Sequence, residues 1–594
     1  MYLISFAAVF FAAMRNYKCQ EKLNGFSWLV VGYLVYEYAV CFAGGFFELV
    51  KVPYDLYTIA ILNTAAAAFL LYKQHKSGKT QSYRWHLYDG AVLVVLLAAA
   101  IAAGYLRFGA IDIIYATSDP GVHLRMAMDS VNDKSVVAPD NGMYVGQFTN
   151  AIWIELMEPR WQGASVYIPF ILKDVFNLFL SAAMFFTAVR GMLTTPFMKT
   201  AGVVVTLLYM MGYPLNNMVF GFVYLGIAVT SLLFLIFVAQ QMNADRLAPR
   251  AGLSLLSLGA YTVGLGYTFF APAVFIAIFL YLLLWMKKRE LLFSGHFFSK
   301  HFFTINLYVF LIPTLMTLWF TLIWPRMAGG NEFPAAHKMN VEGYIFRNLW
   351  LDFFVFLPFA LYAAWKCLRE KRHSMGALLF GCFTVFQIGS FVLMVNEVVS
   401  TYYYFKLNFV QWALILFLTV VAISYLQQQK AFVAAIGCCY IGACVLTLSG
   451  LDYELNQKNV LFNPFPEGHA LMEIYCENQL MYDWNADQQI APGLQQVCDE
   501  VYRNYNSGDA LTPYIGTWLE NYWYEALSNE RHRTNYAFKV GTEKIVREFL
   551  NGDYGDYIVV EKGSEEYAAA AEMLDGLSRV YENEFAFIAQ RPGV

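Results

Sequence analysis

A polar cluster interrupts a strongly apolar sequence in the stretch SDPGVHLRMAMD, residues 118–129. Its charged or titratable members are Asp119, His123, Arg125 and Asp129. The pair Asp119-Pro120 favours a helix start, because Asp accepts hydrogen bonds from first-turn amides and Pro has no amide hydrogen to lose there. On such a helix Asp119 and His123 would share one face. Arg125 and Asp129, also four positions apart, would form a solvated ion pair.

Two interpretations of Asp119 follow from this pattern. In the first, its carboxylate only caps the helix. In the second, it caps the helix and also has a functional role.

Three further charged residues lie inside apolar runs: Lys173, Asp174 and Asp352. A charge at the centre of a bilayer costs about 2.5–3.5 kcal/mol on insertion scales, so such side chains usually face a cavity or a partner. We expect these residues either to line a cavity or to hold helices together.

The elements that position these residues are membrane spans. Of 594 residues, 58% are apolar and only 14% are charged, compared with about 25% charged in soluble domains. The sequence therefore predicts an α-helical polytopic membrane protein with about 12–14 transmembrane helices, and no basic block indicates nucleic acid. The predicted spans are 1–14, 27–49, 54–72, 88–106, 165–189, 200–212, 217–241, 252–268, 270–286, 302–324, 345–365, 376–395, 405–427 and 431–449.

Lys and Arg gather in the connections 73–84, 246–250, 287–289 and 366–372. The positive-inside rule assigns these connections to the cytoplasm, and the predicted spans place all of them on one side. Both termini and the connections 107–164, 325–344 and 396–404 then face outward. Trp153 and Trp161 in the first of these predict helices that lie along the membrane surface.

Residues 451–594 are more polar and predict a soluble extracytoplasmic α/β domain. DYIVVEK (556–562) and EFAFIAQR (584–591) are typical of strands. The segment 564–581 between them is typical of a helix with Ser564 as its N-cap. Cys476 and Cys498 either pair or remain two buried thiols.

The layout resembles that of the GT-C membrane glycosyltransferases, which take sugars from lipid-phosphate donors. The resemblance lies in an Asp…His stretch in the first large outward loop, Asp119 and His123 here, and in many spans and an outward α/β domain. It covers nearly the whole chain, with 1–450 as the transmembrane GT-C-like module and 107–164 as the outward catalytic loop with surface helices. In the family the acidic loop usually follows the first span, whereas four predicted spans precede it here. Residues 1–87 therefore either add N-terminal helices or indicate that the roles align differently.

The resemblance implies transfer of a sugar from a polyprenyl-phosphate-linked donor to a cell-surface glycan or a similar acceptor, on the extracytoplasmic face of the cell membrane. Asp119 would be the general base that takes the proton of the acceptor hydroxyl, and His123 would orient it, hold a second proton or join a metal site. If Asp119 is only a cap, the candidates for the base are Asp112 and Asp129. A divalent cation such as Mg²⁺ or Mn²⁺ is compatible with this chemistry, although a hard ion prefers more oxygen ligands than an Asp/His pair offers.

A phosphate leaving group needs cations at the outer edge of the membrane. Lys406 beside Tyr403, in the stretch STYYYFK, fits this role, as do Arg326, His337 and Lys338 in the connection 325–344. The alternative is that Tyr and Lys serve only as interfacial anchors. Under the transferase hypothesis, the candidates to line the donor cavity are Asp129, Lys173, Asp174 and Asp352.

Two other functions fit a chain of this kind. A polymerase or ligase acting on a lipid-linked oligosaccharide tends to use arginines in outward loops, and few are present before the C-terminal region. A transporter or flippase of lipid-linked sugars often shows inverted repeats with paired broken helices, and only one broken segment, around Pro214, is visible.

Overall fold

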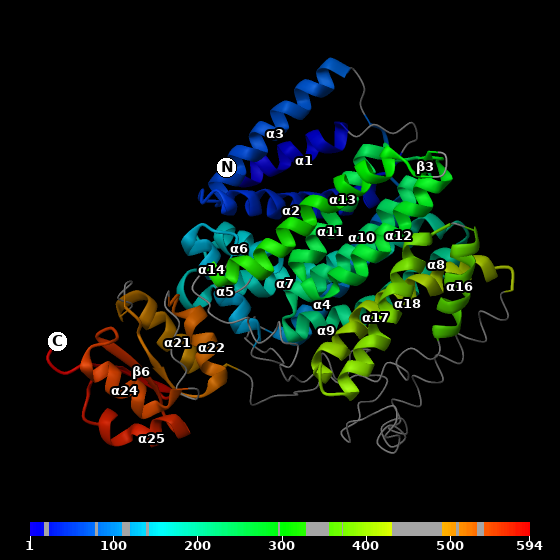
Figure 1. Ribbon diagram of the computed structural model, residues 1–594. Coiled ribbons are helices and arrows are strands. Elements are labelled where there is room, and N and C mark those ends of the chain that lie inside the picture. Colours follow the sequence, from blue (N-terminus) through cyan, green and yellow to red (C-terminus); the bar gives the residue numbers. More distant parts are fainter. Residues whose placement is uncertain are drawn as a thin grey trace.

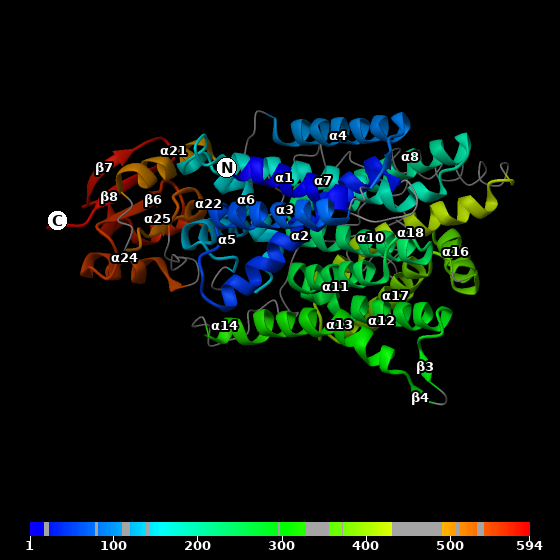
Figure 2. The ribbon, with the colours of Figure 1, turned by 90° about the horizontal axis from the view of Figure 1, so that it is seen from above.

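The computed structural model describes residues 1–16, 23–77, 81–109, 119–137, 142–294, 297–327, 356–370, 372–429, 490–505, 510–530 and 540–594. Within these ranges, ten helices are long and apolar enough to cross a membrane, which confirms a multi-pass helical membrane protein. They are Gly25–Leu49, Leu56–Ser77, Leu87–Phe108, Gly163–Met192, Pro196–Phe220, Val223–Asn243, Thr268–Lys288, Lys300–Ile323, Ser374–Val395 and Tyr403–Leu426. Their arrangement is shown in Figures 1 and 2, where the C-terminal region lies at one end of the helix bundle. The antiparallel strands β3 (Phe293–Ser294) and β4 (Phe297–Phe298) lie at the other end.

The N-terminal helices are partly central to the bundle. Helix α1 (Tyr2–Asn16) pairs with α3 (Leu56–Ser77), and α4 (Leu87–Phe108) packs on α7 (Tyr167–Val189). Helix α2 (Gly25–Leu49) packs against α6 (Tyr144–Met157), α7 and α11 (Pro249–Gly266). Helix α2 therefore belongs to the core of the bundle.

Helices α5 (Asp119–Asp133) and α6 (Tyr144–Met157) lie in the connection 107–164, which the sequence predicts to face outward. A helix on a membrane surface exposes one face, but most of the α6 side chains between Tyr144 and Ile154 are buried. Helix α6 packs on α7, α10 and α11, and α5 packs on α6. The two helices are therefore built into the protein, a difference from the expected surface helices.

The segment around Pro214 is a broken element, as its proline predicts. Helix α8 (Pro196–Met211) ends at Gly212, and α9 (Tyr213–Phe220) follows at once. Gly221 then adopts the left-handed region (φ 65°) and turns the chain into α10 (Val223–Asn243). A Cβ at Gly221 would lie 2.3 Å from Pro120, so this turn abuts the first residues of α5.

The remaining helices complete the bundle. Helix α18 (Thr401–Leu426) packs on α16 and α17 and also contacts α7, α8 and α10. The others are α11 (Pro249–Gly266), α12 (Ala271–Lys288), α13 (Lys300–Leu318), the π-helical turn Trp319–Ile323, α14 (Trp324–Met327), α16 (Leu357–Glu370) and α17 (Ser374–Val395). Part of the predicted span 345–365 and all of the span 431–449 lie outside the described residues.

The C-terminal region contains the predicted small α/β layer. Its sheet has the order β5-β6-β8-β7, with β5 and β6 parallel and the other pairs antiparallel. The strands are β5 (Tyr514–Ile515), β6 (Tyr557–Glu561), β7 (Ser578–Glu582) and β8 (Ala586–Gln590), and the helices are α21 (Pro492–Glu500), α22 (Trp518–Leu527), α24 (Thr542–Asn551) and α25 (Glu565–Leu574).

The predicted N-cap is confirmed, because the Ser564 side chain accepts a hydrogen bond from the amide of Tyr567. The predicted helix 564–581 is too long. It ends at Leu574, and Ser578–Glu582 instead forms strand β7 against β8. Cys498 is a buried free thiol, and Cys476 lies outside the described residues.

Candidate active site

Asp119 is the first residue of α5, and its side chain is half-buried. Its carboxylate interacts electrostatically with His123 and Lys406, and with the hydroxyl groups of Tyr267, Tyr403 and Tyr522. A negative charge at this position is therefore placed beside a histidine, a lysine and several phenols. The predicted proximity of Asp119 and His123 on one helix face is confirmed.

His123 is buried, and neither ring nitrogen has a hydrogen-bond partner among the described residues. Its ring packs edge-on against Tyr224, with 4.8 Å between the ring centroids. Burial lowers the pKa of His123 to about 4; Asp119 opposes this shift, and Lys406 adds to it. The imidazole is therefore neutral near pH 7 and carries one donor and one acceptor nitrogen, both available to a ligand.

Lys406 lies in a cage of aromatic side chains near the start of α18, and its side chain is only 2% exposed. Its Nζ donates a hydrogen bond to the Tyr224 hydroxyl at 2.8 Å. The same nitrogen lies 4.8 Å from the ring centroid of Phe222, 5.1 Å from that of Tyr224, 5.4 Å from that of Tyr267 and 5.8 Å from that of Tyr403. Cation–π attraction supports an ammonium group in such a desolvated place.

Several elements meet at this point because small residues allow a close approach. Tyr224 comes from the first turn of α10, and Tyr267 follows the last residue of α11. A Cβ at Gly146, in α6, would lie 3.0 Å from the Cα of Tyr224, so glycine is what lets α6 reach this turn. The cluster around Asp119, His123, Lys406, Tyr224 and Tyr267, which we call the acid–lysine cluster, is thus fixed by helix packing.

The C-terminal region docks on the helix that carries Asp119. Nε of Arg125 lies 3.2 Å from Oε2 of Glu525 in α22, a contact of ion-pair length without hydrogen-bond geometry, and both side chains are buried. Arg125 Nη1 also lies 3.4 Å from Oδ2 of Asp129. The expected Arg125–Asp129 pair is therefore formed, but it is buried and not solvated. Asn132 Nδ2 also donates to Asn529 Oδ1 at 2.6 Å across the same contact.

Other predicted site residues lie elsewhere. Lys173 is fully buried and pairs with Glu37 of α2, so it holds helices together and is not among the residues that interact with Asp119. Asp174 lines a small cavity of about 20 Å³ that also touches Phe222. Asp129 interacts with Arg125. His337, Lys338, Asp352, the alternative base Asp112 and the side chain of Arg326 lie outside the described residues.

The donor set does not fit a resident divalent cation. Among the residues that the structure describes, no group of three His, Cys, Asp or Glu side chains is gathered. Asp119 and His123 supply one carboxylate and one imidazole, fewer ligands than a hard cation requires. We therefore assign no catalytic step to a metal ion.

Three aromatic residues of the cage around Lys406 were not predicted from the sequence: Phe222, Tyr224 and Tyr267. In a chain with 51 Phe and 41 Tyr, aromatic residues at span ends do not stand out. The stretches GFVYLG and GLGYTFF, with glycine beside tyrosine at the ends of two neighbouring spans, are the only signal. Their significance depends on α10 and α11 packing together, which a single sequence does not reveal.

No protein-family profile and no curated protein sequence matches the chain. Among solved structures, the chain is similar to ArnT from Cupriavidus metallidurans bound to undecaprenyl phosphate, with a TM-score of 0.50, 13% identity, and coverage of 84% of this chain and 97% of that one. It also matches the oligosaccharyltransferase of Archaeoglobus fulgidus in the apo form, with a TM-score of 0.43, 12% identity, and coverage of 80% and 69%. At these identities the likeness to ArnT concerns the fold alone, and it agrees with the resemblance seen in the sequence. The chain therefore has a polytopic helical membrane fold like that of ArnT.

Proposed function

We propose that the protein transfers a sugar from a polyprenyl-phosphate-linked donor to a glycan or similar acceptor on the extracytoplasmic face of the membrane. The observation that carries this proposal is the acid–lysine cluster. It combines a half-buried carboxylate, a buried ammonium group, and a buried histidine whose two ring nitrogens have no hydrogen-bond partner among the described residues. Such a histidine is expensive to bury unless a polar ligand completes it.

Each group has a role in a displacement at the anomeric carbon. Asp119 takes the proton of the acceptor hydroxyl as the new bond forms between that oxygen and the anomeric carbon. The bond from the anomeric carbon to the phosphate oxygen breaks, and its electron pair leaves with the phosphate. Lys406, held by Tyr224, stabilises the negative charge that develops there. Neutral His123 binds a sugar or acceptor hydroxyl with its free nitrogens.

The supporting comparison is limited to fold. ArnT, the solved structure of similar fold, is described as bound to undecaprenyl phosphate, which makes this lipid a sensible first probe. The outward orientation rests on the cytoplasmic assignment of the Lys- and Arg-rich connections. The candidate site lies at the first turn of α10 and the start of α18, the outer ends of these spans in that orientation.

The test uses the purified full chain reconstituted in liposomes with a panel of polyprenyl-phosphate sugars. Asp119→Asn should reduce turnover by a factor of about 10² or more. Asp133→Asn is the matched control, because it makes the same change at an exposed position of the same helix. Equal turnover of Asp119→Asn and wild type would exclude Asp119 as the base.

A second substitution tests the phosphate role. Lys406→Ala should raise the apparent KM for the lipid donor and weaken binding of undecaprenyl phosphate, whereas Lys134→Ala, at an exposed lysine near α5, should change neither. Release of free polyprenyl phosphate together with a longer acceptor identifies a transferase. Movement of an intact lipid-linked sugar across the bilayer, without bond cleavage, would identify a transporter instead.

A further inference from the structure

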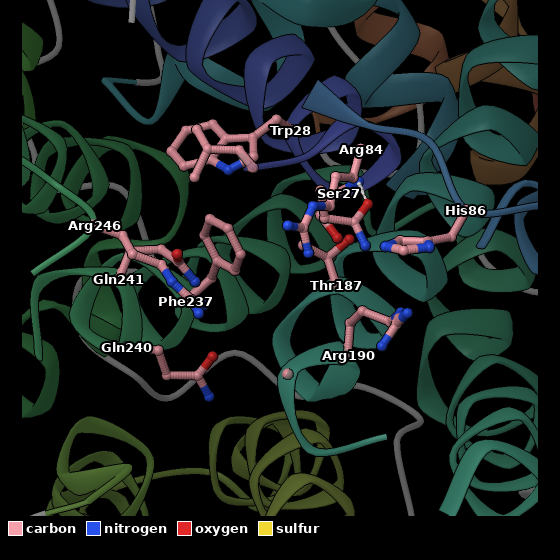
Figure 3. A pocket seen from close by; sticks show the side chains of 13 residues that line it. Ser27, Trp28, Arg84, His86, Thr187, Arg190, Phe237, Gln240, Gln241 and Arg246 are labelled. Carbon is pink, nitrogen blue, oxygen red and sulfur yellow. Dashed lines mark hydrogen bonds between the residues drawn. The ribbon is translucent and has the colours of Figure 1, made fainter. Parts of the chain in front are cut away.

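Helix α10 borders two hollow places of very different size. In its last turn, Gln240 and Gln241 line a pocket of about 280 Å³, which Figure 3 shows from close by. In its first turn, Gly226 borders the cavity of about 20 Å³ that also touches Asp174 and Phe222, which we call the α7–α9 cavity. A water molecule needs about 10–15 Å³ of such space, so the α7–α9 cavity has room for one water, whereas the pocket in Figure 3 has room for many.

The α7–α9 cavity lies where α7, the broken helix α9 and the start of α10 meet. Pro214 interrupts the helix on one side, and Gly226 has no side chain to fill the space on the other. Helix α7 closes the cavity with three polar residues that lie on one of its faces: Asp174, Asn177 and Ser181. The break in the chain therefore leaves a small space with a polar wall inside the bundle.

Two amide side chains at this cavity are unsatisfied. Nδ2 of Asn177 and Oδ1 of Asn217 are buried atoms without a hydrogen-bond partner among the described residues, and both residues line the cavity. The side chain of Asn217 is only 9% exposed. A buried polar group without a partner is costly, and most such groups are satisfied by protein or by ordered water. The two amides therefore indicate a polar occupant of the cavity.

The two unsatisfied atoms are complementary. Nδ2 of Asn177 is a donor and Oδ1 of Asn217 is an acceptor, so one water can accept from the first and donate to the second. The other hydrogen of that water faces the remaining polar wall, where Asp174 and Ser181 offer oxygen atoms. Because an amide has both a donor and an acceptor, one water also serves the pair if either amide is turned end for end.

We infer that the α7–α9 cavity binds one structural water molecule, which bridges α7 to the broken helix α9. Buried waters typically make about three hydrogen bonds to polar groups that lack other partners. In membrane helices, ordered water is one of the means by which a break at proline is tolerated. The cavity also touches Phe222, whose ring lies 4.8 Å from Nζ of Lys406, so the water would support one wall of the cage around that lysine. This inference does not depend on the proposed transfer reaction.

The first measurement is a density map of the full chain in lipid nanodiscs, at a resolution that shows ordered water. The wild type should show a peak at about 2.7–3.2 Å from both amide groups. Gly226→Ala should lose that peak, because its methyl group takes up space in the cavity. The three atoms nearest to a Cβ at Gly226 all belong to Asn217, at 3.5–3.7 Å, so the methyl group enters without overlap. An empty wild-type cavity, or a direct hydrogen bond between Asn177 and Asn217, overturns the proposal.

The second measurement uses the sign of a stability change. Alanine is favoured over glycine inside a helix, and a methyl group that fills a dry cavity improves packing, so an empty cavity implies a higher thermal unfolding midpoint for Gly226→Ala. Displacement of a bridging water leaves two buried amides unsatisfied, and the midpoint should fall by about 2 °C or more. Gly389→Ala, inside α17 with nothing within 4 Å, is the matched control for helix propensity and should have an equal or higher midpoint. A higher midpoint in Gly226→Ala overturns the bridging water.

A sodium ion is the competing occupant, because the carboxylate of Asp174 also lines the cavity. The midpoint of the wild type is therefore compared in sodium chloride and in choline chloride at equal concentration. A bound water implies equal midpoints in the two salts. A midpoint that falls in choline chloride for the wild type, but not for Gly226→Ala, keeps the site and overturns its assignment to water.

Discussion

The buried ion pair between Arg125 and Glu525 should hold the C-terminal region on the helix that carries Asp119, and its two halves should differ in importance. Arg125 interacts with two carboxylates, at 3.2 Å from Glu525 and 3.4 Å from Asp129. Replacing Arg125 by Met leaves the buried carboxylate of Glu525 and the partly buried carboxylate of Asp129 without this cation, whereas Glu525→Leu leaves Arg125 with Asp129. Removing one partner of a buried pair costs about 3–5 kcal/mol. Loss of one charged contact with the other retained costs about 1.5–3 kcal/mol.

Hydrogen exchange of the α22 amides measures this difference, because they exchange when α22 opens away from α5. Each 1.4 kcal/mol changes the rate about tenfold, so Arg125→Met should accelerate exchange by two to three orders of magnitude. Glu525→Leu should accelerate exchange of the α22 amides by one to two orders of magnitude. Lys134→Ala, which removes an exposed ion pair with Asp55, should leave exchange unchanged. Equal acceleration by the two core variants, or a larger effect of Glu525→Leu, would refute this account of the docking.

Three further predictions follow from packing and charge. Folding lowers the pKa of His123 from its ordinary 6.5 to about 4, so on acidification the unfolded chain binds a proton before the folded chain does. The stability of the wild type should therefore fall as the pH is lowered from 6.5 to 4. His123→Gln should lose less of its thermal unfolding midpoint over the same pH range. Gly146→Ala should reduce both thermal stability and turnover, because its Cβ meets the backbone of Tyr224, whereas Gly389→Ala, with nothing within 4 Å, should be neutral or stabilising. Lys173→Met should lower the yield of folded protein by leaving Glu37 unpaired among helices, and adding Glu37→Leu should restore it; a double variant worse than the single one would contradict a structural role.

Local signals in the sequence predicted much of the framework. Apolar run lengths located the spans, Pro214 located the broken helix, and Ser564 located the start of α25. The error at Ser578–Glu582 shows the limit of such signals. These residues continue a plausible helix, but they pair with β8 along the edge of the sheet, and that tertiary pairing overrides local preference.

For the candidate site, the sequence indicated the residue types but not their partners. Asp119 and His123 were related by helix periodicity, and the structure places them together. The cage around Lys406 comes from residues up to 184 positions away in the chain, so no window of the sequence contains it. The Arg125–Glu525 contact links residues 400 positions apart and was likewise beyond local reasoning.

Buried charges in this protein separate into two kinds, and the difference bears on function. Lys173 and Arg190 each meet a carboxylate from another helix, Glu37 and Asp89, so their charges are matched within the fold. Lys406 is instead held by a tyrosine hydroxyl and aromatic rings, with the half-buried Asp119 as its electrostatic neighbour. An aromatic cage attracts a cation through the faces of its rings. Insertion cost alone does not distinguish these cases, because it is the same for every buried lysine. Lys406 is the candidate for phosphate binding because it lies beside Asp119 and His123 in the acid–lysine cluster.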